Sequence, residues 1–178
     1  MDEKRLFATL LFAACVARLE CKLPLIGKEW DIREFVKTPE PIWTYATSQA
    51  AEIICKEDIK KVMTFRFIVF YRSYYYKRKK MTFRLEGEFD PRQKARMTII
   101  SKAGTLNQTE DIIYMSKRLT CAVVRVTPNF GSFVKMYDLR IRNSTTREPI
   151  ESKCLDIFKS RAGRKIYVLY QNRCQYLP

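Results

Sequence analysis

The sequence lacks side chains that catalytic and metal sites commonly use, and it is rich in cationic ones. The 178 residues include no histidine, which excludes a catalytic triad of the serine–histidine–aspartate type. No two cysteines have the CxxC spacing, and we predict no zinc site, no other metal and no cofactor. Positive charge dominates instead, with 34 Lys and Arg against 19 Asp and Glu and a net charge of +15. Such a chain is expected to attract polyanions: nucleic acid, heparin-like glycans, acidic membranes or acidic protein surfaces.

Residues 1–21 have the features of a secretory signal peptide. Lys4 and Arg5 precede an apolar run that ends at Ala17 among small residues, the order that signal peptides share. The run is too short to span a bilayer, which takes about 20 residues. We therefore expect cleavage between about residues 17 and 22 and a single secreted domain, residues 22–178. A buried N-terminal helix is the alternative.

Two further features fit secretion. Cys15 leaves with the signal peptide, and Cys21 does so if cleavage falls after it, so the mature chain keeps an even set of four cysteines: Cys55, Cys121, Cys154 and Cys174. In an oxidising compartment such a set predicts two disulfide bonds, and the sequence alone permits three pairings. Asn107 and Asn143 begin the sequons NQT and NST, which predict surface glycosylation.

From about residue 42 onward the dominant hydrophobic period is two, the period of β-strands. Helical periodicity is confined to residues 29–36 and 151–161, with Gly163 placed to end the second helix. Short strands at near-regular spacing favour an antiparallel sandwich or an up-and-down barrel, in one domain. The predicted strands are 42–48, 62–72, 81–89, 95–101, 110–116, 120–127, 134–143 and 165–171.

One stretch, residues 62–89, is rich in both aromatic and cationic side chains and permits two interpretations. A surface for single-stranded nucleic acid would place both kinds of side chain on one face. Here the apolar residues stand mainly at odd positions, whereas Arg66 and Arg72 stand at even ones. Successive strand residues point to opposite sides. We therefore predict a β-hairpin with its odd face inward, its cations outward and residues 74–80 as the connection, and no nucleic-acid partner.

The order of several short motifs resembles the tick salivary lipocalins, the group that includes the histamine-binding proteins of tick saliva. The resemblance runs from about Pro41 to Cys174. Its motifs are PIWTYATS (41–48), RSYYY (72–76), LEGEFD (85–90), EDIIY (110–114), CAVVRV (121–126) and YDLRIRNS (137–144).

This resemblance implies an all-β fold, an eight-stranded antiparallel barrel with a C-terminal helix packed outside. The helical periodicity of residues 29–36 adds a short N-terminal helix to that expectation. The resemblance also implies the pairings Cys55–Cys174 and Cys121–Cys154. An eight-stranded barrel encloses room for one small ligand. Proteins of this group sequester host mediators and are not enzymes.

The amine-binding members of the group carry an acid directly after the second of the four cysteines, then Glu-Leu-Trp or Glu-Leu-Tyr on a following strand. Here Ala122 follows Cys121, and the second motif reads Asp138-Leu139-Arg140. Asp138 could still pair with a ligand ammonium, which needs a carboxylate partner in a low-dielectric cavity. Tyr137, beside it in sequence, could add a cation–π contact.

Arg140 indicates a different ligand. If Asp138 faces the lumen, Arg140 faces it too, and a guanidinium in an apolar barrel suits the carboxylate of a fatty acid or eicosanoid. The alternatives are an internal Asp138–Arg140 pair, or two side chains that face solvent. Trp43 is expected to pack at the bottom of the barrel or to contact the ligand. For Phe65, Phe67 and Tyr114, core packing and lumen lining cannot be separated from sequence.

The resulting hypothesis is a secreted, monomeric, non-enzymatic lipocalin that sequesters a host biogenic amine, histamine or serotonin, and so blunts inflammation. A lipid mediator (leukotriene, thromboxane or fatty acid) is the first alternative. The second is a macromolecular partner, such as heparin-like glycan or a clotting or complement factor, bound through the basic segments 74–80 and 159–165. No membrane span is expected.

Overall fold

The computed structural model describes residues 30–102, 104, 106–129 and 134–177. The predicted signal peptide and its cleavage site lie outside these residues. Within them, no helix combines the length and the apolar character needed to cross a bilayer.

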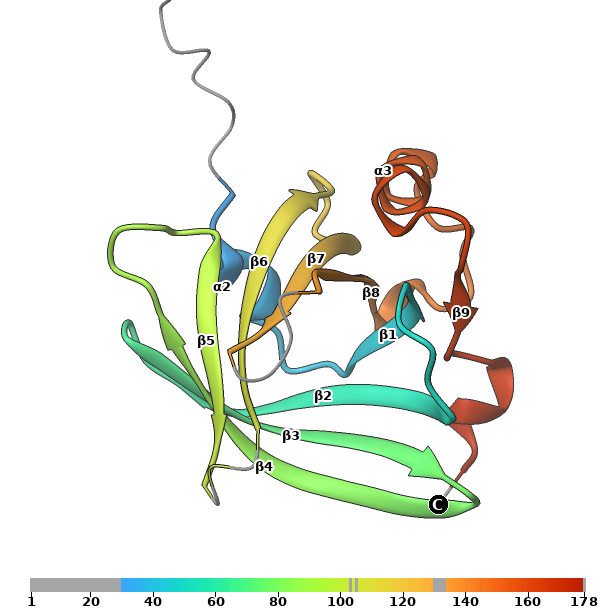
Figure 1. Ribbon diagram of the computed structural model, residues 1–178, viewed down its shortest axis with the longest axis horizontal. Helices are drawn as coiled ribbons and strands as arrows, with labels where there is room; N and C mark the ends of the chain where they lie inside the picture. The colour runs from blue at the N-terminus through green and yellow to red at the C-terminus, as the bar shows by residue number, and fades with distance from the viewer. Residues whose placement is uncertain (1–29, 103, 105, 130–133, 178) are drawn as a thin grey trace, which may run out of the picture.

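Eight antiparallel strands form a closed barrel, as the family resemblance implied, and not the sandwich that strand periodicity alone left open (Figure 1). The sheet runs in the order β2-β3-β4-β5-β6-β7-β8-β1, and pairing of β1 with β2 closes it, with Ile42 opposite Asp58. A ninth strand, β9 (Tyr167–Val168), is short and pairs with Ala46 and Thr47 of β1, on the edge of β1 opposite β8. The barrel strands are β1 (Ile42–Thr47), β2 (Ile53–Met63), β3 (Phe67–Tyr76), β4 (Lys79–Phe89), β5 (Arg96–Ser101), β6 (Asn107–Met115), β7 (Cys121–Pro128) and β8 (Met136–Arg142).

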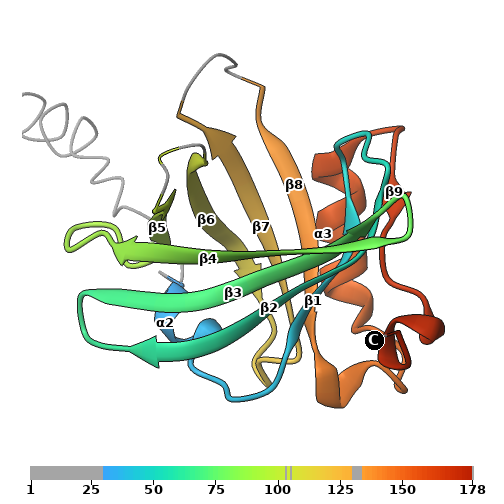
Figure 2. The ribbon, with the colours of Figure 1, turned by 90° about the horizontal axis from the view of Figure 1, so that it is seen from below.

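A short N-terminal helix, α2 (Ile32–Val36), covers one end of the barrel (Figure 2). The side chain of Asp31 caps it by accepting a hydrogen bond from the Arg33 amide at 3.0 Å. At its other end, Arg142 of β8 donates to the carbonyls of Glu34 and Phe35 at 3.0 and 2.9 Å. These bonds fix the helix against the end of β8, and its apolar face is buried against the barrel interior.

The C-terminal helix, α3 (Ser152–Ala162), packs against the outside of the barrel beside β8 and β7 (Figure 1). Gly163 ends it with a φ of +71°, a left-handed conformation that glycine adopts without steric cost. Cys154 and Phe158 are the buried residues of its inner face. Two short 3-10 turns, η1 (Asn143–Thr145) and η2 (Asn172–Gln175), flank the helical segment in sequence.

The predicted strand 62–72 was wrong, because it spans a turn. Residues 53–63 form β2, which the sequence pattern missed, and β3 begins only at Phe67. Between them Thr64 closes the turn by accepting a hydrogen bond from the Phe67 amide at 3.1 Å.

The face assignment of this region was correspondingly wrong for β3 and right for β4. Even-numbered residues of β3, among them Ile68, Phe70 and Arg72, pair with the inward Gly87, Leu85 and Phe83 of β4. Arg72, expected in solvent, is therefore buried. The expected connection 74–80 is also mostly strand, since only Lys77 and Arg78 form the turn, both with positive φ.

The wall of the barrel separates two hydrophobic cores. The inner core fills the barrel beneath α2 and contains Ile32, Phe35, Val36, Ile42, Ile68, Phe70, Leu85, Phe89, Met97, Ile99, Ile112, Met115, Ala122, Val124 and Val126. The outer core lies between the barrel and α3 and contains Trp43, Ala46, Cys55, Tyr114, Cys121, Val123, Leu139, Ile141, Cys154, Phe158, Tyr170 and Cys174.

Both disulfides lie in the outer core and have the pairing that the family resemblance implied. Cys55–Cys174 ties β2 to η2, and Cys121–Cys154 ties β7 to α3. The bridges span 119 and 33 residues of sequence. They fasten the C-terminal segment to the barrel, and leave the interior to other side chains.

Candidate ligand-binding site

The barrel interior holds a network of charged side chains in addition to the inner core. Among the described residues it comprises Lys56 and Asp58 from β2, Arg72 from β3, Glu110 from β6, and Asp138 and Arg140 from β8. We call these six residues the lumen network. The strand register explains the grouping, because Asp58 is directly opposite Arg72, and Asp138 and Arg140 share one face of β8.

Glu110 is the centre of the lumen network and is fully buried. Arg140 binds it with both terminal nitrogens, Nη1 to Oε2 at 2.6 Å and Nη2 to Oε1 at 2.8 Å. Arg72 donates to Oε1 at 3.1 Å, and Gln108 donates to the same oxygen at 2.7 Å. A buried carboxylate is tolerated when it is paired and hydrogen-bonded in this way.

Asp58 and Asp138 occupy the two sides of this centre. Arg72 binds Asp58 with two nearly parallel hydrogen bonds, of 2.7 and 2.8 Å. Asp138 receives the Lys56 ammonium at 3.2 Å and Arg140 Nη2 at 3.3 Å, both on Oδ2. The internal Asp138–Arg140 pair, one of the alternatives left open by the sequence, is therefore present. Three cations face three carboxylates, so the charges of the lumen network sum to zero.

Burial and pairing act in opposite directions on the pKa values of these groups. Burial alone would raise the pKa of Glu110, but Arg140 and Arg72 outweigh it and hold that pKa far below its usual range. For Asp138, burial is likewise outweighed by Lys56 and Arg140, and its pKa is lowered. Lys56 is the exception, since burial lowers its pKa despite the attraction of Asp138. Lys56 is therefore the one group of these three in which the effect of burial exceeds that of the neighbouring charges.

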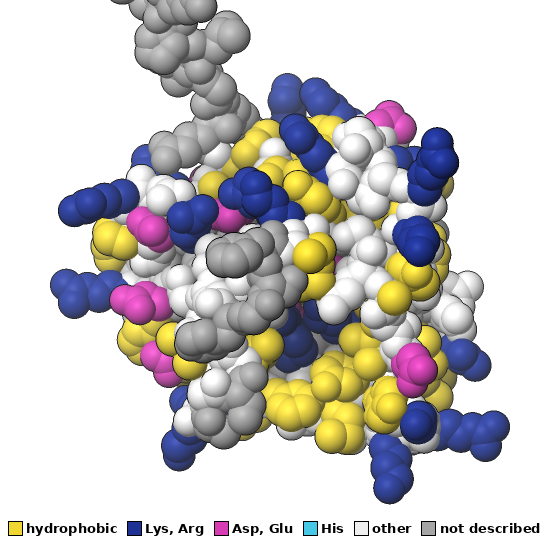
Figure 3. All heavy atoms as spheres, in the orientation of Figure 1, with side chains coloured by type: hydrophobic (Ala, Val, Ile, Leu, Met, Phe, Trp, Pro, Cys, Tyr) yellow, Lys and Arg dark blue, Asp and Glu magenta, His cyan; other side chains and the backbone are white. Residues whose placement is uncertain are grey.

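Lys56 and Asp138 lie near the end of the barrel opposite α2. Asp138 pairs with Thr47, the last residue of β1, and Lys56 is close to the start of β2. In the orientation of Figure 1 the centre of the molecular face is hollowed, and Lys or Arg side chains are visible within the hollow (Figure 3). A ligand that enters from this face would meet charged groups before it reaches the inner core.

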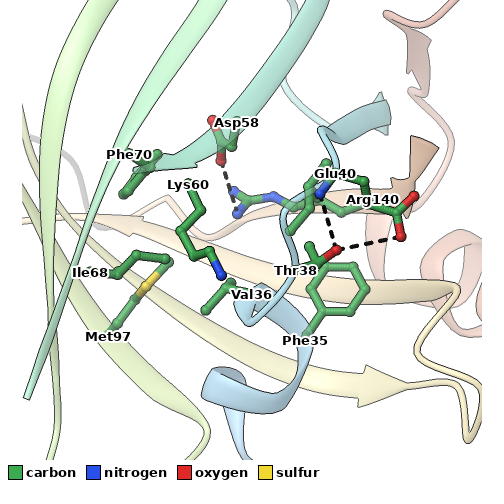
Figure 4. A pocket seen from close by; sticks show the side chains of 11 residues that line it. Phe35, Val36, Thr38, Glu40, Asp58, Lys60, Ile68, Phe70, Met97 and Arg140 are labelled. Atoms are coloured by element: carbon green, nitrogen blue, oxygen red, sulfur yellow. Dashed lines mark hydrogen bonds and ion pairs between the residues drawn. The ribbon is translucent and has the colours of Figure 1, made fainter. Parts of the chain in front are cut away.

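A small cavity lies on the α2 side of the lumen network (Figure 4). Its volume is about 20 Å³, enough for about one water molecule. Apolar side chains, including Phe35, Ile68 and Met97, form much of its wall, and Lys60 and Arg140 contribute polar groups. A molecule the size of histamine or serotonin needs more room, so side chains must move when such a ligand binds.

Two donors at this cavity have no acceptor within the part of the chain that the structure describes. The Nε of Arg140 is buried without a hydrogen-bond partner. Lys60 stands two residues after Asp58, on the same face of β2. Its ammonium has no acidic partner among the described residues. The cavity therefore offers one buried donor without an acceptor and one half-buried lysine without an acidic partner, whereas the carboxylates of the lumen network are already paired.

Two of the sequence-predicted aromatic residues, Trp43 and Tyr114, lie in the outer core and not in the lumen. Trp43 packs against Tyr170 with the two rings tilted and their centroids 5.2 Å apart, and its Nε1 donates to Asn143 Oδ1 at 2.8 Å. The Tyr114 hydroxyl donates to Glu151 at 2.8 Å. Their inward neighbours on the same strands, not these rings, face the ligand site.

The remaining aromatic residues predicted for the site are also outside the lumen. Phe65 is the tip of the β2–β3 turn and is 79% exposed. Phe67 neighbours the inward Ile68 and so faces the other way. Tyr137 is half-buried and packs against the outer core. Of the seven ligand-binding residues expected from sequence, the structure brings Asp138 and Arg140 together inside the barrel.

The two sequons lie at strand ends. Asn107 begins β6 and is half-buried, with its side chain bonded to Asn129. Asn143 begins η1, and its side-chain oxygen Oδ1 accepts hydrogen bonds from Trp43 and from Gln175, the latter at 2.7 Å. Glycosylation at either residue stays a prediction.

Sequence reasoning missed four members of the lumen network: Lys56, Asp58, Arg72 and Glu110. The sequence feature that could have revealed them is a series of charged residues of alternating sign at every second position of a strand. In β2 the positions 56, 58 and 60 read Lys, Asp, Lys, a same-face pattern that is consistent with ion pairing across a sheet. Ala122, which stands where amine-binding members have an acid, faces the lumen opposite Arg140 and adds no charge.

Comparison with known proteins agrees with this architecture. A family model described as tick histamine binding protein matches residues 56–176, well over half of the chain. Among curated protein sequences, none matches. Among solved structures, AM182 in complex with serotonin has a TM-score of 0.67 at 16% identity, over 85% of this chain and 97% of that one.

Two further solved structures show how widely the fold is shared. Japanin from Rhipicephalus appendiculatus, bound to cholesterol, has a TM-score of 0.56 at 7% identity, over 77% of this chain and 96% of that one. A bovine odorant binding protein variant has a TM-score of 0.54 at 12% identity, over 74% and 93%. At these identities the likeness establishes the lipocalin barrel and nothing finer.

Proposed function

The chain belongs to the tick histamine-binding protein family, and from this premise we propose that it is a secreted, non-enzymatic carrier that sequesters a biogenic amine such as histamine or serotonin and so blunts host inflammation. Family and fold both support the binding of a small ligand in the barrel. The observation that carries the choice of an amine is Asp138, a carboxylate that is 2% exposed and faces the lumen. It occupies the position of the acid in the family's Glu-Leu-Trp motif.

An ammonium ligand requires a carboxylate that can change its partner. Glu110 is held by two arginines and a glutamine, and Asp58 by a bidentate arginine. Asp138 instead meets a lysine and the outer nitrogen of Arg140, at 3.2 and 3.3 Å. These are the longest hydrogen bonds among the ion pairs of the lumen network, which makes Asp138 the acid that a ligand can engage at the lowest cost.

Calorimetric titration of the disulfide-bonded secreted chain tests the proposal. We expect histamine or serotonin to bind with a Kd below about 10 μM. Asp138→Asn should weaken that binding by about tenfold or more, since a tenfold loss corresponds to only about 1.4 kcal/mol. Asp111→Asn is the matched control, because Asp111 pairs with Arg96 and Arg125 outside the lumen. Absence of amine binding, or equal losses in both variants, would contradict the proposal.

A lipid mediator is the second candidate, favoured by the buried Arg140 Nε, which has no acceptor, and by the Lys60 ammonium beside it, which has no acidic partner among the described residues. A carboxylate head group would supply the acceptors that these donors lack, beside the apolar wall of the cavity. In this case arachidonate or leukotriene B4 should bind, and Lys60→Met should weaken that binding while amine binding stays unchanged. Binding of heparin alone, lost as salt rises, would instead identify the basic surface as the functional one.

A further inference from the structure

We infer that the Lys56 ammonium occupies the place of the ligand ammonium, as a built-in counterion that an incoming amine displaces from Asp138. The inference rests on the proposed amine function and specifies how that site opens and what sets its affinity. Its basis is the position, burial and weak attachment of Lys56 compared with the other cations of the lumen network.

Lys56 is held by fewer contacts than either arginine. Its ammonium makes one ion pair within the described chain, to Asp138 Oδ2 at 3.2 Å. Arg72 makes three hydrogen bonds to carboxylates, and Arg140 makes three as well, down to 2.6 Å. Bidentate guanidinium contacts are both stronger and geometrically fixed, whereas a lysine is a point charge on a flexible stem. Lys56 is the cation whose release breaks the fewest bonds.

Lys56 also lies between the buried acid and water. Its side chain is 16% exposed, against 4% for Asp138, 4% for Arg140 and 0% for Glu110. Rotation of its four-carbon stem can carry the ammonium into solvent at the end of the barrel opposite α2. Rotation of Arg140 would also remove its two hydrogen bonds from the fully buried Glu110, which would weaken the pairing of that carboxylate.

Charge balance makes the exchange necessary as well as feasible. The lumen network is neutral and Lys60 adds a further cation beside it, so an added ammonium would increase the uncompensated positive charge inside the barrel. If Lys56 moves to water as the ligand ammonium arrives, the network stays neutral and Asp138 keeps a partner. Burial already lowers the pKa of Lys56, which is consistent with a cation that gains solvation by leaving. The exchange also vacates the volume of a lysine side chain, which the 20 Å³ cavity alone does not provide.

This mechanism predicts a ligand class and an affinity limit. The ligand carries a protonated amine on a slender arm that can follow the path of the lysine stem, and an acetylated amine cannot substitute. Because Asp138 is occupied by Lys56 in the free protein, the measured affinity is reduced by the fraction of molecules in which the site is free. Removal of Lys56 should therefore tighten amine binding.

The test compares Lys56→Met with Lys60→Met by calorimetric titration with serotonin and N-acetylserotonin. Both lysines point inward from β2 and both changes remove one positive charge, but Lys60 does not contact Asp138. We expect serotonin to bind Lys56→Met about tenfold more tightly than the parent, and Lys60→Met about as tightly as the parent. N-acetylserotonin should bind none of the three. Circular dichroism confirms that each variant folds.

A second measurement uses the unmodified sequence and does not depend on a variant. After reductive 13C-methylation of the lysines, the NMR signal of Lys56 should move to an exposed-lysine position as serotonin saturates the protein. An unmoved signal, or equal affinities of Lys56→Met and Lys60→Met, would overturn the exchange while leaving amine binding in place. Failure of serotonin and histamine to bind the parent and the Lys56→Met variant would overturn the amine function itself.

Discussion

The inner and outer cores share one barrel wall, yet they are built from different chemistry. Along β8 the inward residues are Asp138 and Arg140, and the outward residues are Leu139 and Ile141, all of them buried. The outer core is apolar, rich in aromatic rings and crossed by both disulfides, whereas the interior combines apolar residues with the lumen network. The difference indicates that the outer core is held by apolar packing and disulfides, whereas the interior also carries the groups suited to a polar ligand.

The same contrast occurs between two adjacent acids on β6. Glu110 points inward and binds Arg72 and Arg140, whereas Asp111 points outward and binds Arg96 and Arg125. Each acid therefore has two arginine partners. They differ in solvent access, since the partners of Asp111 are 29% and 31% exposed and those of Glu110 are 6% and 4% exposed.

The largest effect should come from Glu110→Ala. Removal of the central carboxylate takes the main partner from the buried Arg140 and one of three hydrogen bonds from the buried Arg72, and we expect a loss of about 3–5 kcal/mol in the free energy of unfolding. Asp111→Ala should cost about 1 kcal/mol or less, because its arginines can turn to water. Urea unfolding followed by circular dichroism measures both. Equal losses would show that the inner and outer acids are energetically alike.

Loss of either disulfide should weaken the outer core. We expect the pair Cys55→Ala and Cys174→Ala to lower the free energy of unfolding by about 2–4 kcal/mol, and Cys121→Ala with Cys154→Ala by about 1 kcal/mol less. The difference follows from the enclosed segments of 119 and 33 residues, because a longer loop loses more chain entropy when it is closed. Ligand affinity at 25 °C should change little, and a large loss of affinity would link the two cores.

Acid and alkali should act on different cores. The pKa of Glu110 is lower in the folded chain than its unfolded value, so its contribution is present above about pH 4.3 and is lost as the pH falls below it. Tyr114 has its pKa raised to about 12, first by burial and then by Glu151, so its contribution is present below about pH 10 and is lost as the pH rises toward 12.

Each such group changes the free energy of unfolding by at most about 1.4 kcal/mol per pH unit. Urea unfolding from pH 3 to 7 and from pH 9 to 11.5 measures the two limbs. Glu110→Gln should flatten the acid limb alone, and Tyr114→Phe the alkaline limb alone. A variant that flattens the opposite limb would show that the assignment of groups to cores is wrong.

The smallest effect concerns Trp43. Trp43→Phe removes the Nε1 hydrogen bond to Asn143 and keeps most of the ring packing against Tyr170, so we expect a cost of about 1 kcal/mol in thermal unfolding. The Kd for an amine should stay within about twofold of the parent value. A larger change in affinity would place Trp43 functionally inside the site, in conflict with its position in the outer core.

The sequence was sufficient for the fold where apolar periodicity and motif order agreed. The barrel, α3 with its Gly163 stop and the short N-terminal helix were predicted, and both disulfide pairs followed from the family resemblance. The inward face of β4 was predicted correctly, because its inward residues from Leu85 to Phe89 carry no charge.

The interior could not be predicted by the same rule. Periodicity assigns charged residues to solvent, and β2 has Lys56, Asp58 and Lys60 on its inward face. Without the partners on β3, β6 and β8, these charges looked like those of a loop, so β2 was missed and Arg72 was assigned to the outside. Arg72 and Glu110 form an ion pair although they are 38 residues apart in sequence. Such a pair depends on the closed barrel, and the residues near either partner in sequence do not reveal it.

The neutrality of the lumen network has an evolutionary consequence. A single substitution among its six charged residues upsets the charge balance of the barrel interior, and such variants should be less stable than the parent. Lineages can therefore change the interior only through compensating pairs: a relative that has lost Glu110 should also lack Arg72 or Arg140, and one with an acid at the position of Ala122 should carry a further cation or bind a cationic ligand. Ligand preference in this family would then evolve in steps of two residues, and an alignment of relatives should show these positions co-varying.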